Sequence, residues 1–174
     1  MSASLAARIF RTAHLTGEFT LRSGAVAAEY FDKYRFESDP VLLHDIAEAL
    51  APLVGDGVDA LAGLELGGVP IAVALSRVTG IPAVFVRKTA KTYGTRRLAE
   101  GGDVAGRRLL IVEDVVTSGG QVAASAGQLR DEGATVARAL CVIDRQAGGQ
   151  AALAAEGVDL TALFTMTELK SAAE

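Results

Sequence analysis

Runs of consecutive apolar residues recur along the chain, and segments with apolar residues at helical spacing lie between them. In one such run, residues 109–112 read Leu-Leu-Ile-Val without the polar alternation of a half-exposed strand, which predicts a strand buried on both faces. Similar runs predict strands at residues 60–64, 83–86, 136–143 and 160–164. Helical spacing predicts helices at residues 68–78, 120–132 and 150–156. This alternation predicts an α/β fold with a mainly parallel, twisted sheet flanked by helices.

The N-terminal part of the chain follows a different pattern. Apolar side chains share one helical face over residues 5–13, which predicts a first helix. Residues 18–36 predict short strands or an irregular flap. Asp39 can cap a helix whose first position is Pro40, and we expect this helix to run to about Val54.

Length and composition favour a single domain. The chain has 174 residues, enough to bury a substantial core, and we expect residues 1–174 to form one domain in which residues 1–37 contribute the N-terminal helix and a hood or flap. Half of the residues are hydrophobic and 5% are aromatic, which fits strands rich in Val, Ile and Leu covered by helices rich in Ala. The one cysteine, Cys141, excludes an intrachain disulfide.

Charge and hydropathy narrow the range of partners. The formal net charge is −4 and the pI is near 5.3, so we expect no overall attraction to nucleic acid or to anionic lipid. No uninterrupted apolar segment has the length of a membrane span. The sequence therefore predicts a protein with neither a nucleic-acid nor a membrane partner, and we expect it to be cytoplasmic.

The most informative polar segment follows the predicted strand at residues 109–112. Glu113 and Asp114 are expected at the carboxyl end of this strand, where carboxylates suit sugar hydroxyls or a hydrated magnesium ion. The turn and helix start after them consist of Thr117, Ser118, Gly119, Gly120 and Gln121. Free N–H groups at a helix N-terminus favour a phosphate, and glycines let it approach closely, although the glycines alone fit an ordinary strand-to-helix connection equally well. The complete segment predicts a site for a phosphorylated ribose.

A second polar segment, residues 87–102, is basic in an otherwise acidic chain. Its basic residues are Arg87, Lys88, Lys91, Arg96 and Arg97. Charge runs usually face water, but this segment is long for an α/β connection, and long loops are often lids or binding loops. Because the carboxyl ends of parallel strands share one edge of the sheet, we expect residues 65–68, 87–102 and 113–121 to form one site.

Four segments, which occur along the chain in the same order as in the family, resemble segments of the type I phosphoribosyltransferases. Among these enzymes they are most similar to the orotate phosphoribosyltransferases. LLIVEDVVTSGGQ at residues 109–121 resembles the family's 5-phosphoribosyl-1-pyrophosphate motif, and no Gly-Lys-Ser/Thr of a Walker A loop follows its glycines. RKTAKTYGTRRLAEG at residues 87–101 is similar to the flexible catalytic loop, and VIDRQAGG at residues 142–149 to the segment with a base-binding arginine. With TLRSG at residues 20–24, the resemblance covers roughly residues 18–164.

The resemblance implies a role for each matching residue on the sugar and diphosphate side. Glu113 and Asp114 would bind the ribose hydroxyls, directly or through water and a Mg²⁺ ion carried by the substrate, and residues 117–121 would hold the 5-phosphate. Arg87, Lys88 and Lys91 would contact the pyrophosphate. Lys88, Lys91 and Asp114 are thereby candidate catalytic residues. In the family this loop commonly closes over the neighbouring subunit's site, which implies a homodimer with loop 87–102 reaching that site.

Further matches concern the base and the pyrophosphate turn. Arg145 would meet the orotate, and Tyr30 and Phe31 would bracket the pyrimidine with backbone groups. Gly67 and Gly68 would belong to the pyrophosphate-binding turn.

The chain also departs from some relatives. Arg22, a candidate substrate-binding residue, and Gly67 stand where some relatives have lysine, and Tyr93 stands where some have histidine. Because the turn has no lysine, we expect more of the contacts to pyrophosphate to come from the loop cations, backbone donors or the metal.

The implied reaction joins orotate to 5-phosphoribosyl 1-pyrophosphate and gives orotidine 5′-monophosphate and pyrophosphate, in the de novo synthesis of UMP. The ribose-phosphate motif does not encode the base, so a phosphoribosyltransferase for another base remains an alternative. A non-catalytic regulator that senses phosphoribosyl pyrophosphate is a second alternative, of a different class.

Overall fold

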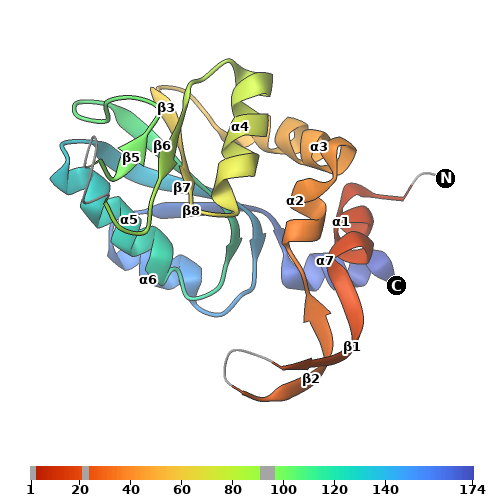
Figure 1. The fold of residues 1–174 in the computed structure, drawn as a ribbon. Helices are drawn as coiled ribbons and strands as arrows, with labels where there is room; N and C mark the ends of the chain where they lie inside the picture. Colours follow the sequence, from red (N-terminus) through yellow and green to blue (C-terminus); the bar gives the residue numbers. More distant parts are fainter. Residues whose placement is uncertain (1–2, 21–23, 91–96) are drawn as a thin grey trace.

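The centre of the structure is a twisted sheet (Figure 1). The computed structural model describes residues 3–20, 24–90 and 97–174. Within these residues six strands lie in the order β5-β4-β3-β6-β7-β8, and all neighbours are parallel except β4 and β5. The strands are β3 (Ala60–Leu64), β4 (Ala83–Val86), β5 (Ala99–Glu100), β6 (Arg108–Val116), β7 (Thr135–Asp144) and β8 (Asp159–Thr165). Strand β6, which leads to the expected phosphate turn, therefore lies in the middle of the sheet.

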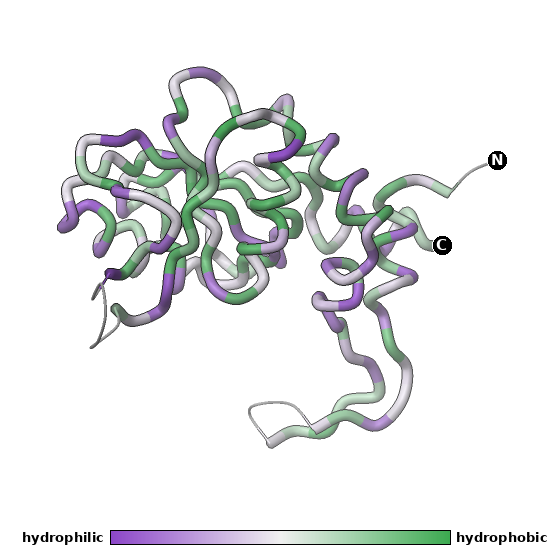
Figure 2. The backbone as a smooth tube through the Cα atoms, turned by 45° about the horizontal axis from the view of Figure 1, so that its top comes forward, coloured by the Kyte–Doolittle hydropathy of each residue, from purple (hydrophilic) through white to green (hydrophobic). Residues whose placement is uncertain are grey.

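Helices cover both faces of this sheet and shield its apolar strands from water. One face carries α5 (Gly120–Asp131) and α6 (Gly149–Ala155). The other carries α1 (Leu5–Ala13), α3 (Pro40–Leu50), α4 (Gly68–Thr79) and α7 (Met166–Ala173). Figure 2 shows hydrophobic residues concentrated along the central strands and hydrophilic ones along the outer connections. The fold class predicted from the sequence is confirmed.

The side chains of β6 alternate between two buried clusters. Leu109 and Ile111 pack on the face covered by α5 and α6, whereas Leu110 and Val112 pack on the face covered by α3 and α4. All four are at most 4% exposed. An uninterrupted apolar run was the correct signal for a strand buried on both faces.

An antiparallel hairpin projects from the body near the N-terminus (Figure 1). It consists of β1 (His14–Thr20) and β2 (Val26–Phe31), and the short helix α2 (Tyr34–Ser38) follows it. The next helix, α3, begins as predicted: Oδ1 of Asp39 accepts hydrogen bonds from the backbone N–H groups of Val41 and Leu42, each at 3.0 Å. Helix α3 continues into a 3₁₀ turn, η1 (Ala51–Leu53).

Strand β6 is longer than the sequence predicted, and this corrects the expected place of the two acids. Glu113 and Asp114 lie inside the strand, which ends only at Val116. The reason is the neighbouring strand, because β7 continues to pair with β6 until Asp144 lies opposite Val116. Backbone pairing thus outweighs the low strand propensity of the two acids.

The sequence prediction did not include α2, β5 and α7. Helix α7 begins at a capping box, in which Oγ1 of Thr165 accepts a hydrogen bond from the N–H of Glu168 while the N–H of Thr165 donates to Oε2 of Glu168. This helix packs against α1. In the described ranges, no helix is both long and apolar enough to cross a membrane.

Candidate active site

A cradle of backbone and hydroxyl groups lies where β6 passes into α5. The hollow has a volume of about 170 Å³, and Glu113, Thr117, Ser118, Gly119, Gly120 and Gln121 are among its lining residues. Gly119 has a φ of +80°, and a Cβ there would lie 2.9 Å from Cγ of Leu153. Both observations require glycine at this position. The turn presents the first free N–H groups of α5 to the hollow, which suits an anion such as a phosphate.

The two acids of β6 point to opposite faces of the sheet, because adjacent residues of a strand alternate. Glu113 lines the phosphate cradle and accepts a hydrogen bond at Oε1 from the N–H of Asp114, at 3.0 Å. Asp114 faces the turn before α4 and is completely buried. The pair therefore presents carboxyl groups on both faces of β6, just before the strand ends at Val116.

Asp114 contacts two residues that sequence analysis did not single out, Lys33 and Glu37. Nζ of Lys33 lies 2.5 Å from Oδ2 of Asp114, and Glu37 is buried beside it, at 7% exposure. The two come from α2 and the residue that precedes it, far from Asp114 in the sequence. No spacing rule connects them to the acid, so only the fold reveals the cluster.

Burial and mutual contact give the carboxyl groups of this cluster unequal proton affinities. Burial, with the contact to Asp114, raises the pKa of Glu37 to about 9. Burial, with the charge of Asp114, also raises the pKa of Glu113 to about 9. Burial acts to raise the pKa of Asp114 as well, but the neighbouring Glu37 and Glu113 and the ammonium of Lys33 hold that pKa below its usual value. Asp114 is thus the ionised acceptor of the cluster.

The glycines of the turn before α4 are required by its close approach to β6. A Cβ at Gly67 would lie 1.6 Å from Oδ2 of Asp114, and a Cβ at Gly68 would lie 2.3 Å from the carbonyl oxygen of Val112. The turn also contacts the basic loop, because Oε1 of Glu65 accepts a hydrogen bond from the N–H of Lys88 at 2.6 Å. The structure therefore brings together residues 65–68, the start of the basic loop and the acids, as expected.

The two ends of the basic loop lie side by side. The N–H of Arg87 donates to the carbonyl oxygen of Leu98 at 2.9 Å, and Nε of Arg87 lies 3.4 Å from Oε1 of Glu100. At the far end, Arg97 forms an ion pair with Asp103 at 2.8 Å.

Some predictions fall on parts of the chain that the structure leaves undescribed. Lys91, Tyr93 and Arg96 of the loop lie outside the described residues, as does Arg22 of the hairpin. Their suggested roles stay predictions.

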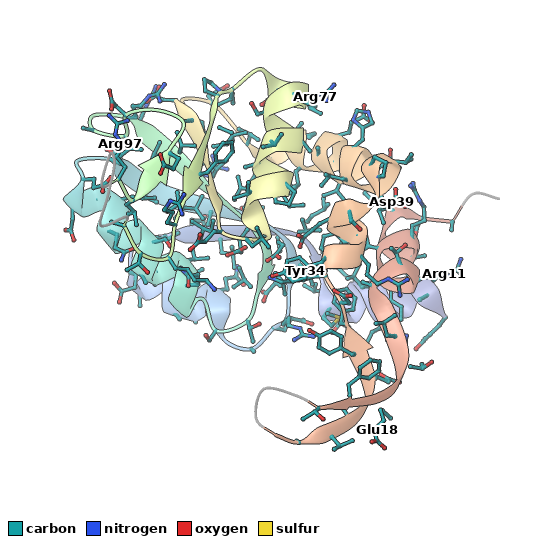
Figure 3. The ribbon with its side chains drawn as sticks, in the orientation of Figure 1. Arg11, Glu18, Tyr34, Asp39, Arg77 and Arg97 are labelled. Carbon is teal, nitrogen blue, oxygen red and sulfur yellow. The ribbon has the colours of Figure 1, made fainter. Side chains whose placement is uncertain are left out.

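A larger hollow of about 420 Å³ separates the hairpin from the sheet. Its lining includes the predicted base-binding residues Tyr30, Phe31 and Arg145, together with Ala27, Glu29, Lys33, Tyr34, Val115 and Thr117. The N–H of Arg145 donates to the carbonyl oxygen of Val116 at 2.9 Å, which fixes this residue at the end of β6. Tyr34, labelled in Figure 3, lies where the hairpin and α2 meet the body.

The two hollows adjoin, because Val115 and Thr117 line both. The cradle between β6 and α5, the two acids and the hollow beside the hairpin therefore lie together at the carboxyl edge of the sheet. This arrangement, on a mainly parallel sheet, is that of a type I phosphoribosyltransferase.

Comparison with known proteins agrees with this class. The chain belongs to the phosphoribosyl transferase domain family, whose profile matches residues 35–156. It is 52% identical over 174 residues to the orotate phosphoribosyltransferase of a Nocardioides species, an alignment that covers 100% of this chain and 97% of that protein.

Solved structures give the same result. The orotate phosphoribosyltransferase of Mycobacterium tuberculosis in complex with Fe(III) dicitrate superimposes with a TM-score of 0.87 at 33% identity, covering 95% of this chain and 96% of the other. The same enzyme in complex with 5-phospho-α-D-ribosyl 1-diphosphate gives a TM-score of 0.81 at 30% identity, with the same coverage.

Proposed function

We propose that this chain is an orotate phosphoribosyltransferase, which transfers the 5-phosphoribosyl group from 5-phosphoribosyl 1-pyrophosphate to orotate and releases pyrophosphate. The product, orotidine 5′-monophosphate, is a precursor of UMP in pyrimidine biosynthesis. The observation that carries this proposal is the shared wall of the two hollows, formed by Val115 and Thr117, since one nucleotide bridging them would contact the cradle and Arg145 together. The relatives described above carry this activity in their names.

Each charged part of the substrates would be bound by a different group of this site. N–H groups at the start of α5 would hold the 5-phosphate, and the guanidinium of Arg145 would pair with the orotate carboxylate. Displacement at the anomeric carbon passes through a transition state with oxocarbenium character, in which negative charge grows on the leaving pyrophosphate. Two lysines of the basic loop, Lys88 at its start and Lys91, would stabilise that charge. They would do so more strongly in the transition state than in the ground state.

Magnesium is part of the proposal. Carboxylate oxygens are the ligand type that Mg²⁺ prefers, directly or through water. Asp114 offers them in the free protein, and Glu113, whose pKa is raised to about 9, would offer them once Mg²⁺ displaces its proton. A bound Mg²⁺ would add positive charge beside the leaving pyrophosphate. The acids' own part would be to orient the ribose hydroxyls, and the N–H of Val115, 2.5 Å from Oδ1 of Asp114, holds that acid in place.

The remaining predictions are proposals of the same kind. A homodimer in which loop 87–102 reaches the neighbouring site is tested by sedimentation, and by mixing a variant inactive in the loop with one inactive in the cradle. Recovery of activity in the mixture supports a site shared between subunits. The cytoplasmic location is tested by cell fractionation.

The activity itself is tested by following the ultraviolet absorbance of orotate with phosphoribosyl pyrophosphate, with and without Mg²⁺. We expect turnover of orotate that needs Mg²⁺, and far slower turnover of uracil, hypoxanthine and adenine. Turnover of a purine alone would overturn the choice of base. Binding of phosphoribosyl pyrophosphate without product from any base would favour the sensing regulator.

A further inference from the structure

An ammonium group lies against the buried ribose-binding acid. Nζ of Lys33 is 2.5 Å from Oδ2 of Asp114, and the aspartate side chain is 0% exposed whereas that of Lys33 is 34% exposed. Lys33 also lines the hollow between the hairpin and the sheet, together with Tyr30 and Arg145. This ion pair therefore connects the base hollow with the ribose site.

Gly67 explains why the positive charge comes from Lys33. A Cβ at position 67 would lie 1.6 Å from Oδ2 of Asp114 and 2.9 Å from Oε1 of Glu37. The turn before α4 thus has no room for a side chain, including the lysine that some relatives have there. A buried carboxylate without a partner is costly, and Lys33 supplies the missing charge from the residue before α2.

The ion pair occupies the oxygen that the ribose needs. Oδ1 of Asp114 accepts a hydrogen bond from the N–H of Val115, whereas Oδ2 is buried and faces Nζ of Lys33. A ribose hydroxyl arriving at Oδ2 meets the ammonium of Lys33 there. The lysine has space to turn aside, because part of its side chain is exposed and Nζ lies 5.3 Å from the centre of the Tyr34 ring.

We propose that Lys33 exchanges partners during the reaction: it pairs with Asp114 in the free protein and, once ribose hydroxyls occupy that acid, donates to the carboxylate of orotate beside Arg145. This inference rests on the proposed function and deepens it. Two cations facing one hollow favour an anionic base, because orotate carries a carboxylate that uracil and adenine lack. Lys33 is then a specificity-determining residue that also lowers the affinity for phosphoribosyl pyrophosphate.

The test uses Lys33→Met and Lys33→Gln in the full-length protein. Glutamine can still donate a hydrogen bond to Asp114 but has no charge, so it keeps the site packed if Lys33→Met does not fold. In both variants we expect the KM for orotate, at saturating phosphoribosyl pyrophosphate, to rise about tenfold or more. The Kd of phosphoribosyl pyrophosphate, measured by calorimetry without orotate, is expected to stay unchanged or to fall, because no ion pair has to open.

Three comparisons complete this design. The ratio of kcat/KM for orotate over uracil is expected to fall in both variants, and Lys33→Arg is expected to recover part of the orotate affinity. Lys170→Met, which removes an exposed lysine on α7, is the matched control and should behave as the unmodified protein.

The outcomes separate this inference from the proposed function. An unchanged KM for orotate in the variants would overturn the role of Lys33, and so would a raised Kd for phosphoribosyl pyrophosphate with normal use of orotate. Failure of the unmodified protein to convert orotate at all would instead overturn the proposed function, and the inference with it.

Discussion

The backbone N–H of Lys88 donates a hydrogen bond to Oε1 of Glu65 at 2.6 Å. This bond connects the start of the basic loop, residues 87–102, to the turn before α4. The two residues follow neighbouring parallel strands, β4 and β3, and meet at the carboxyl edge of the sheet. A cation at the start of the loop is thereby held next to the glycine turn expected to receive pyrophosphate.

Glu65→Ala is therefore expected to lower kcat about tenfold, equivalent to roughly 1.4 kcal/mol of transition-state stabilisation. The reason is that Lys88 loses the hydrogen bond that positions its backbone. Glu65→Gln keeps an oxygen acceptor and should retain most of the activity. Steady-state kinetics of both variants are the measurement, and Glu48→Ala, which changes an exposed side chain of α3, is the control. Equal kcat in Glu65→Ala and in the unmodified protein would show that this hydrogen bond does not position the loop.

Gly67→Ala is expected to lower both stability and activity. The added Cβ would overlap the Asp114 carboxylate, so the turn or the acid must move, and overpacking of this kind typically costs about 1–3 kcal/mol. Denaturant unfolding and the KM for phosphoribosyl pyrophosphate measure the two effects. The control is Gly127→Ala within α5, where a Cβ meets nothing within 4 Å and should raise stability by up to about 1 kcal/mol. Normal stability and KM in Gly67→Ala would contradict the close packing of this turn.

Lys91→Ala is expected to lower kcat at least about tenfold, roughly 1.4 kcal/mol, with a smaller effect on substrate binding. The lysine is assigned to the charge that develops on the leaving pyrophosphate. Lys170→Ala serves as the charge-matched control, and single-turnover kinetics separate the chemical step from product release. Normal turnover in Lys91→Ala would remove this residue from the mechanism.

The stability of the free protein is expected to depend on pH through Glu37. Its pKa is raised from 4.5 to about 9, so between these values the folded protein holds a proton that the unfolded chain releases. The stabilising contribution is therefore complete below pH 4.5 and is lost as the pH rises toward about 9. Glu37→Gln should reduce the loss of stability between about pH 6 and about pH 8.5, as measured by denaturant unfolding. An identical loss in Glu37→Gln and the unmodified protein would contradict a buried, protonated Glu37, and exposed Glu48→Gln is the control.

Local sequence signals predicted the body of the fold well, and they failed where distant residues decide the structure. The run at residues 60–64 and the cap at Asp39 gave β3 and the start of α3, because burial and capping depend on neighbouring residues. The end of β6 depends on its pairing with β7, which no local signal contains. The capping box of α7, Thr165 with Glu168, is by contrast a local signal, although the sequence prediction did not include this helix.

In the candidate site too, some residues were predictable from the sequence and others depend on contacts between distant segments. The glycine turn and Arg145 follow strands, and the acids lie near the carboxyl end of β6, so their meeting at one edge was predictable, since parallel strands bring their carboxyl ends to one edge. Lys33 and Glu37 reach Asp114 only through the packing of α2 against α1 and α3, which sequence spacing does not indicate.

The most direct test of the account is a crystal structure of this protein with orotidine 5′-monophosphate. We expect the phosphate against the N–H groups of residues 117–120, the ribose hydroxyls at Asp114 and the base carboxylate at Arg145. A nucleotide whose phosphate lies away from that turn, or whose base lies outside the hollow between hairpin and sheet, would contradict the single site described here.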